Sequence, residues 1–197
     1  SRLIGRQLIF YSPMEVDLYG DSSNSLPAVR AWQAKPGAFK RILPATEIYQ
    51  TGLSSNAYDL TLHSVTTCDI TERSTLECRA KAVLGPSSRV FYVSADSVYI
   101  WIGGSGMYGQ ARKPNESTLL RMPLGSSAPQ ALRVSGNPID QMSFLERDGY
   151  INVLVGSQSN GDGMWRAESK AGSLALLRAP LRAFGGTGAR SQEKHYR

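Results

Sequence analysis

A six-residue pattern that occurs twice limits the possible folds of this chain more than any other feature. LLRMPL begins at Leu119 and LLRAPL begins at Leu176, an offset of 57 residues. Each copy follows two apolar runs joined by a tight turn, and Tyr99 in the first pair takes the place of Ile151 in the second, an offset of 52 residues. A repeat of about 50 residues that contains several strands is typical of the blades of a β-propeller.

The rest of the chain contains many strand patterns and few helix patterns. Runs rich in Val, Ile, Tyr and Leu alternate with segments rich in Gly, Ser, Asn, Asp and Pro, which are turn formers. The step Asp148-Gly149 predicts a two-residue hairpin turn, because both central residues of that turn need positive φ angles. We therefore predict an all-β fold, an incomplete β-propeller built of four-stranded antiparallel blades. The alternative is a β-sandwich or barrel in which the repeat is a coincidence.

The spacing of the repeat predicts how the blades divide the chain. We expect a single partial propeller domain over residues 1–197, with blades at 89–135 and 138–185. Residues 1–85 are an irregular blade with an insertion at 34–57, and residues 186–197 are a flexible basic tail. The expected core residues are Val93, Val98, Ile100, Leu120, Met142, Phe144, Ile151, Val153, Val155 and Leu176.

The length of the chain predicts open blade faces. A closed ring needs about four to eight blades. At 52 to 57 residues per blade, 197 residues hold between three and four. We expect the open faces to be covered by the remaining blades of a longer chain or by a second copy.

Net charge says little about partners. The chain carries a formal charge of +6, and residues 178–197 supply +4 of it through five basic residues and one acidic residue. A nucleic-acid interface is not predicted, because no aromatic ladder or basic helix accompanies these charges. No apolar run of eighteen residues is present, so no membrane span is expected.

The order of the strand motifs resembles a known family, the large secreted bacterial β-propeller proteins, most of which are uncharacterised. The resemblance is carried by RLIGRQLIFYS (2–12), RVFYVSADSVYIW (89–101), STLLRMPL (117–124) and VSGNPIDQMSFLERDGYINVLVG (134–156). The chain departs from the family in NPIDQMSF, where a glycine-containing joint is usual. It also stops near FGGTGAR, where family members continue through further blades. The resemblance implies a secreted, periplasmic or cell-surface location and supplies no catalytic motif.

The two cysteines, Cys68 and Cys78, allow two interpretations from the residues alone. A hairpin around DITERST would bring them together in a disulfide, whereas two buried free thiols would pack as small apolar groups. Disulfides are typical of exported proteins. The location that the resemblance implies therefore favours a Cys68–Cys78 bond.

No residue pattern points to catalysis, a cofactor or a metal. Of the two histidines, His63 lies within a strand pattern and His195 lies two residues from the end. Asp162 is too isolated to bind calcium, and Asp140 and Glu146 are expected on a solvent-facing strand surface rather than in a groove between blades. We predict a non-catalytic exported scaffold that binds a protein, peptide or glycan through blade-end loops. The alternative is a hydrolase, or another enzyme, whose carboxylates converge at the propeller channel.

Overall fold

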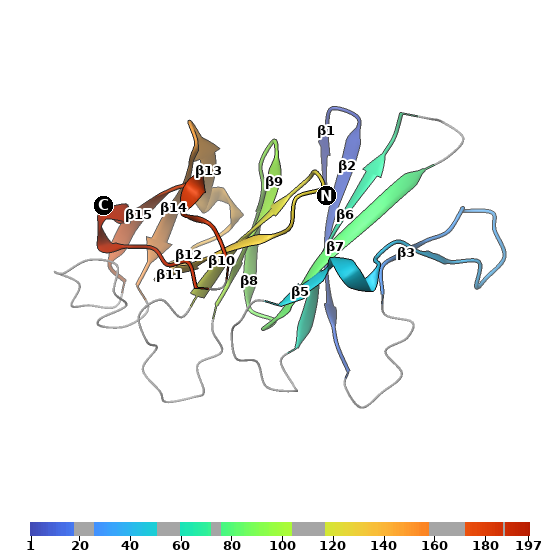
Figure 1. Cartoon of the computed structure of the whole chain (residues 1–197), viewed down its shortest axis with the longest axis horizontal. Helices are drawn as coiled ribbons and strands as arrows, with labels where there is room; N and C mark the ends of the chain where they lie inside the picture. The colour runs from blue at the N-terminus through green and yellow to red at the C-terminus, as the bar shows by residue number, and fades with distance from the viewer. Residues whose placement is uncertain (18–25, 51–59, 72–75, 104–116, 158–171, 187) are drawn as a thin grey trace. The chain divides into compact units, whose positions relative to one another are not determined.

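The computed structural model describes residues 1–17, 26–50, 60–71, 76–103, 117–157, 172–186 and 188–197. These residues form β-strands and short 3-10 helices, and they divide between two compact units. Unit 1 comprises Ser1–Gln50 and Asn56–Ser87, and unit 2 comprises Thr51–Ser55 and Ser88–Arg197. The strands of both units are drawn in Figure 1. The fold is therefore all-β, as the sequence predicts.

Unit 1 is built on a five-stranded sheet with the order β1-β2-β6-β7-β5. Its strands are β1 (Arg2–Ile4), β2 (Gln7–Glu15), β5 (Ile48–Gln50), β6 (Thr61–Asp69) and β7 (Glu77–Gly85). A separate two-stranded hairpin pairs β3 (Ala28–Val29) with β4 (Lys40–Arg41). The turn between β1 and β2 uses Gly5 at a φ of 57°, a left-handed conformation that glycine adopts without a steric penalty.

Part of the predicted insertion at 34–57 joins this sheet. After the 3-10 helix η2 (Ala45–Glu47), strand β5 runs parallel to β7, with Tyr49 opposite Val83. The insertion expected at 34–57 therefore contains an edge strand at residues 48–50. The physical reason is that Ile48 packs against a small buried cluster that includes Leu43, Ala80 and Ala82, and this contact anchors an added edge strand.

The first sheet of unit 2 is a four-stranded antiparallel meander. It contains β8 (Arg89–Val93), β9 (Ser97–Ile102), β10 (Ser117–Pro123) and β11 (Gln130–Val134), paired in chain order. This confirms the meander predicted for residues 89–135. All six residues of β9 are buried, so both faces of this strand are covered. That explains its continuous apolar sequence.

The second sheet of unit 2 has an interrupted first strand. Its elements are β12 (Asn137–Pro138), η3 (Gln141–Ser143), β13 (Phe144–Arg147), β14 (Tyr150–Gly156) and β15 (Leu174–Pro180). Both β12 and β13 pair with the same edge of β14, and β15 pairs with the other edge. The Asp140 carboxylate accepts a hydrogen bond from the Met142 backbone N–H at 2.8 Å and caps η3. The departure from the family in NPIDQMSF therefore corresponds to a capped turn inserted into the first strand.

The turn between β13 and β14 has the conformation that the sequence predicts. Asp148 and Gly149 have φ angles of 53° and 77°, both positive. Antiparallel pairing continues up to this turn, with Arg147 opposite Tyr150.

The hydrogen-bond register corrects the expected alignment of the repeat. Tyr99 lies opposite Arg121, and Asn152 lies opposite Arg178, the matching arginine of the second LLRxPL copy. Tyr99 therefore corresponds to Asn152, not to Ile151, and the second strands are offset by 53 residues. The apolar runs of β9 and β14 look alike in either alignment, because β9 is apolar on both faces and places no polar residue that would mark the register.

Most of the predicted core residues of unit 2 are buried. Val93, Val98, Ile100, Leu120, Phe144, Ile151, Val153 and Val155 lie in the interior. Two predictions are wrong: Met142 is 81% exposed and Leu176 is 39% exposed. Met142 lies on the protruding turn η3, and Leu176 alternates outward in β15 while its neighbour Leu177 is fully buried.

Candidate functional site

The two sheets of unit 2 pack against each other through aromatic side chains. The Phe144 ring on β13 stacks on Tyr92 of β8 at 5.8 Å between ring centroids and meets Trp101 of β9 edge-on at 6.3 Å. These residues belong to one buried cluster with Leu119 and Val153. We call the face of the second sheet that meets the first sheet its inner face, and the opposite face its outer face.

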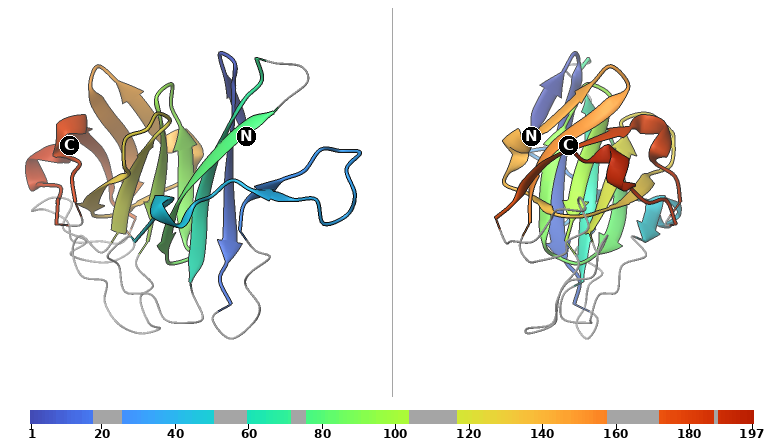
Figure 2. Two further views of the ribbon diagram at one scale, coloured as in Figure 1. Left: turned by 45° about the vertical axis from the view of Figure 1, so that its right-hand side comes forward. Right: turned by 90° about the vertical axis from the view of Figure 1, so that its left-hand side faces the viewer.

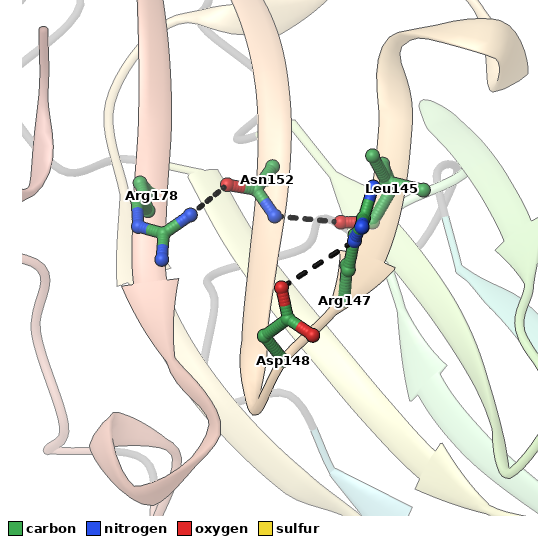
Figure 3. A network of polar contacts seen from close by, with 5 residues as sticks. All are labelled: Leu145, Arg147, Asp148, Asn152 and Arg178. Carbon is green, nitrogen blue, oxygen red and sulfur yellow. Dashed lines mark hydrogen bonds and ion pairs between the residues drawn. The ribbon is translucent and has the colours of Figure 1, made fainter.

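A polar network crosses the outer face (Figure 3). An Nη atom of Arg178 on β15 donates to Oδ1 of Asn152 at 3.3 Å, and Nδ2 of Asn152 donates to the Leu145 carbonyl oxygen at 3.0 Å. The Arg178 guanidinium also lies over the Tyr150 ring, 4.0 Å from its centroid. The corresponding Arg121 of the first sheet donates from Nε to Oγ of Ser97 at 3.1 Å. The arginine of each LLRxPL copy thus contacts the first residue of the neighbouring second strand.

Leucines surround this network on the outer face. The exposed fractions of Leu145, Leu154, Leu174 and Leu176 are 52%, 39%, 57% and 39%. In the corrected alignment, Leu154 corresponds to Trp101 and Leu176 corresponds to Leu119, which are 1% and 0% exposed. The outer face of the second sheet is therefore the equivalent of a face that, in the first sheet, is covered by the next sheet along the chain.

Residues 185–186 and 188–197, which we call the C-terminal segment, bond to both sheets of unit 2. The flexible tail predicted at 186–197 is therefore attached along its described residues. Next to β11, the Arg133 N–H donates to the Ala189 carbonyl at 2.8 Å, and the Ser191 N–H donates to the Arg133 carbonyl at 2.8 Å. Next to β15, Leu176 and Arg197 exchange two backbone hydrogen bonds of 2.7 and 3.1 Å. The free edges of two strands supply these hydrogen bonds, and charge patterning does not reveal them.

Tyr196 anchors the end of this segment. Its side chain is 7% exposed and belongs to the buried cluster of unit 2. Its hydroxyl accepts a hydrogen bond from the Ser135 N–H at 2.8 Å and shares another with the Ser191 hydroxyl at 2.9 Å. The red C-terminal segment can be followed beside β15 in Figure 2.

The attached segment forms one wall of a pocket with positively charged residues, which we call the basic pocket. Its volume is about 390 Å³, and it lies between the C-terminal segment and the 3-10 helix η4 (Leu181–Ala183). The lining residues are Pro180, Arg182, Ala183, Arg190, Gln192, Lys194 and His195. Burial, and then the charge of Lys194, lower the pKa of His195, and Nδ1 of His195 accepts a hydrogen bond from the Gln192 N–H at 3.1 Å. His195, which the sequence left without a role, thus lies at the basic pocket.

Glu146 does not face solvent as predicted but lies on the inner face, opposite Ile151. Burial raises the pKa of the Tyr99 hydroxyl, and the nearby Glu146 carboxylate raises it further. Oη of Tyr99, Nε1 of Trp101 and Oε2 of Glu146 are buried without a hydrogen-bond partner among the described residues. Tyr99 and Trp101 belong to the buried cluster between the two sheets, and Glu146 lies on the inner face of the second sheet.

The two cysteines and His63, the other residues considered from the sequence, make contacts within unit 1. Cys68 and Cys78 are opposite each other on β6 and β7 and are joined by a disulfide. His63 is fully buried: Nε2 donates to the Pro86 carbonyl at 2.8 Å, so Nδ1 accepts from the Tyr11 hydroxyl at 2.8 Å. Asp162 and the loops at 104–116 and 158–171 lie outside the described residues.

Within the described ranges, no cluster of three or more His, Cys, Asp or Glu side chains is placed to hold a metal ion. A search of the same ranges finds no helix with the length and apolar character of a membrane span.

The class of protein follows from these sheets: a four-stranded antiparallel meander and a second antiparallel sheet that packs against its face define a propeller-type all-β protein. The family model of the beta propeller domain matches residues 1–192, and the chain belongs to that family. No curated protein and no solved structure matches the chain.

Proposed function

We propose that this domain is a non-catalytic scaffold and binding module that packs the outer face of its second sheet against another β-sheet. The observation that carries the proposal is the equivalence of Leu154 and Leu176, each 39% exposed, with the buried pair Trp101 and Leu119. Leucines exposed together on one sheet face favour a contact that removes them from water, at about 25 cal/mol per Å² of buried apolar surface.

The chemistry of the partner follows from the repeat. The surface that covers Trp101 and Leu119 is the inner face of the second sheet, which presents branched and small apolar side chains. These are Ile151, Val153, Val155, Ala175, Leu177 and Ala179. A partner that fits the outer face is a further blade with side chains of the same kind. It would leave room for the Arg178–Asn152 network at the margin of the contact.

The disulfide supports a place for this module outside the cytosol. Bonds such as Cys68–Cys78 persist in oxidising compartments and are rare in the reducing cytosol. We infer that the domain is exported and that the proteins, peptides or glycans it binds are extracellular or periplasmic.

The experiment measures how strongly hydroxyl radicals label the leucines of the native protein, together with its mass by light scattering. Leu3 on β1 is 56% exposed and serves as an internal reference for an exposed leucine. We expect Leu154 and Leu176 to be protected relative to Leu3. A dimer mass would assign the covering sheet to a second copy, and a monomer mass would assign it to the same chain. Labelling of both leucines at the rate of Leu3 would contradict the proposal.

A further inference from the structure

The basic pocket has a set of side chains that fits an anionic ligand. Arg182 comes from η4, and Arg190 and Lys194 come from the C-terminal segment, so cations from two separate stretches of chain line one cavity of about 390 Å³. Among the residues that the structure describes, no carboxylate lines it. Glu193 lies on the 3-10 helix η5 (Glu193–His195) but is not part of the lining.

The backbone on both sides of the pocket is held in place by the core. Phe184, which follows η4, is 5% exposed and meets the Tyr99 ring edge-on at 6.0 Å between centroids. Ser191 and Tyr196 are buried on the other side, at 7% exposure each. Arg190, Gln192 and Lys194 are exposed between these anchors. A positively charged surface on an anchored backbone loses little conformational entropy when it binds a ligand.

Among the described residues, no carboxylate forms an ion pair with these cations, Arg182, Arg190 and Lys194. The lowered pKa of His195, to which the charge of Lys194 contributes, is a second sign of positive potential in the pocket. Like charges placed together repel, and a bound anion with more than one negative charge relieves that repulsion.

We propose that the basic pocket binds a phosphate or sulfate ester, a tetrahedral oxyanion attached to a larger ligand. Guanidinium groups match the oxygens of such anions with paired N–H donors, and the lysine adds a point charge. The Gln192 side chain offers a neutral donor. Pro180 and Ala183 give the pocket an apolar part, which suits the organic group of an ester rather than a free inorganic ion.

The test measures binding of four probes by calorimetry and by amide shifts in NMR spectra of the isotope-labelled protein. The probes are inorganic phosphate, inorganic sulfate, phenyl phosphate and phenyl sulfate, at constant ionic strength. We expect the amide signals of Ala183, Arg190 and Lys194 to shift. We also expect each phenyl ester to bind more tightly than its inorganic ion, and tighter binding of the inorganic ion would assign the pocket to a free oxyanion and overturn the ester proposal.

A pair of matched triple variants separates the pocket from general charge. Arg182→Gln, Arg190→Gln and Lys194→Gln together should weaken binding of phenyl phosphate about tenfold, because three exposed charge contacts are lost. The control changes Lys35, Lys40 and Arg147, exposed basic residues that do not line the pocket, to Gln and alters net charge by the same amount. Equal weakening in both variants would overturn the proposal. If the pocket variant does not fold, Lys194→Glu alone should weaken binding of phenyl phosphate and reduce the shifts of the Ala183 and Arg190 amide signals, and unchanged binding would overturn the proposal.

Discussion

At the residue scale, His195 lies at the basic pocket, and its protonation makes the free energy of unfolding depend on pH. Burial and the Lys194 charge hold its pKa below the ordinary value of about 6.5, and protonation of Nδ1 would break the hydrogen bond from the Gln192 N–H. Above that value the residue is neutral in both the folded and the unfolded chain. As pH falls below it, the unfolded chain takes up the proton first, so the free energy of unfolding decreases until the folded pKa is passed.

We therefore expect the His195 ring signals in NMR spectra to titrate below pH 6.5. The variant His195→Asn keeps a side-chain acceptor and should lose less stability between pH 7.5 and 5.0 than the natural chain. Lys194→Gln should move the His195 pKa upward, because it removes a repelling charge. A titration midpoint at or above the ordinary value would contradict this account.

At the element scale, the disulfide joins β6 and β7, two neighbouring antiparallel strands of unit 1. Cys68 and Cys78 are ten residues apart and directly opposite on β6 and β7. A cross-link of this span restricts the unfolded chain, and the double variant Cys68→Ser, Cys78→Ser should lose about 2–3 kcal/mol of unfolding free energy. Urea denaturation measures the loss. Mass spectrometry of the unreduced protein checks the bond itself, and two free thiols would show that the pairing is wrong.

Strand β15 provides a matched pair of leucines that tests its register. Leu177 is fully buried on the inner face, whereas Leu176 is 39% exposed on the outer face. Leu177→Ala should cost about 2–5 kcal/mol through a cavity in the core, and Leu176→Ala should cost less than about 1 kcal/mol. Both values come from denaturant unfolding of the single variants. Equal losses, or the reverse order, would mean that β15 is shifted by one residue.

At the scale of the whole molecule, the C-terminal segment links the two sheets of unit 2 by bonding to the edges of β11 and β15. Tyr196→Ala removes a buried ring and the acceptor of the Ser135 N–H, and it should lower the unfolding free energy by about 3–5 kcal/mol. Hydrogen exchange at Ala131 and Arg133 should become faster, because their amides donate to the segment. The exposed neighbour Lys194→Ala is the control and should leave both measurements almost unchanged.

Short-range chemistry was sufficient to predict the strands and the turns of this chain. The Asp148-Gly149 step predicts a hairpin turn, and the apolar runs with the LLRxPL copies predict the meander at residues 89–135 and the propeller family. These patterns could be recognised because each depends only on residues that are neighbours along the chain. The Cys68–Cys78 disulfide could be predicted in the same way, because paired antiparallel strands hold opposite residues close together. The same reasoning left the alignment of β14 with β9 one residue off, because β9 is apolar on both faces and no polar residue in it marks the alignment.

Only the folded chain decides which faces are covered and where the ends of the sequence attach. Leu119 and Leu176 occupy the same place in their motifs, yet one is buried and the other is 39% exposed, because a following sheet covers only the first. Arg182 and Lys194 line one pocket because the last residues bond to two strand edges that are distant in sequence. Local sequence patterns encode the propensity to form a strand, whereas the partner of a face or an edge depends on residues that lie far away along the chain.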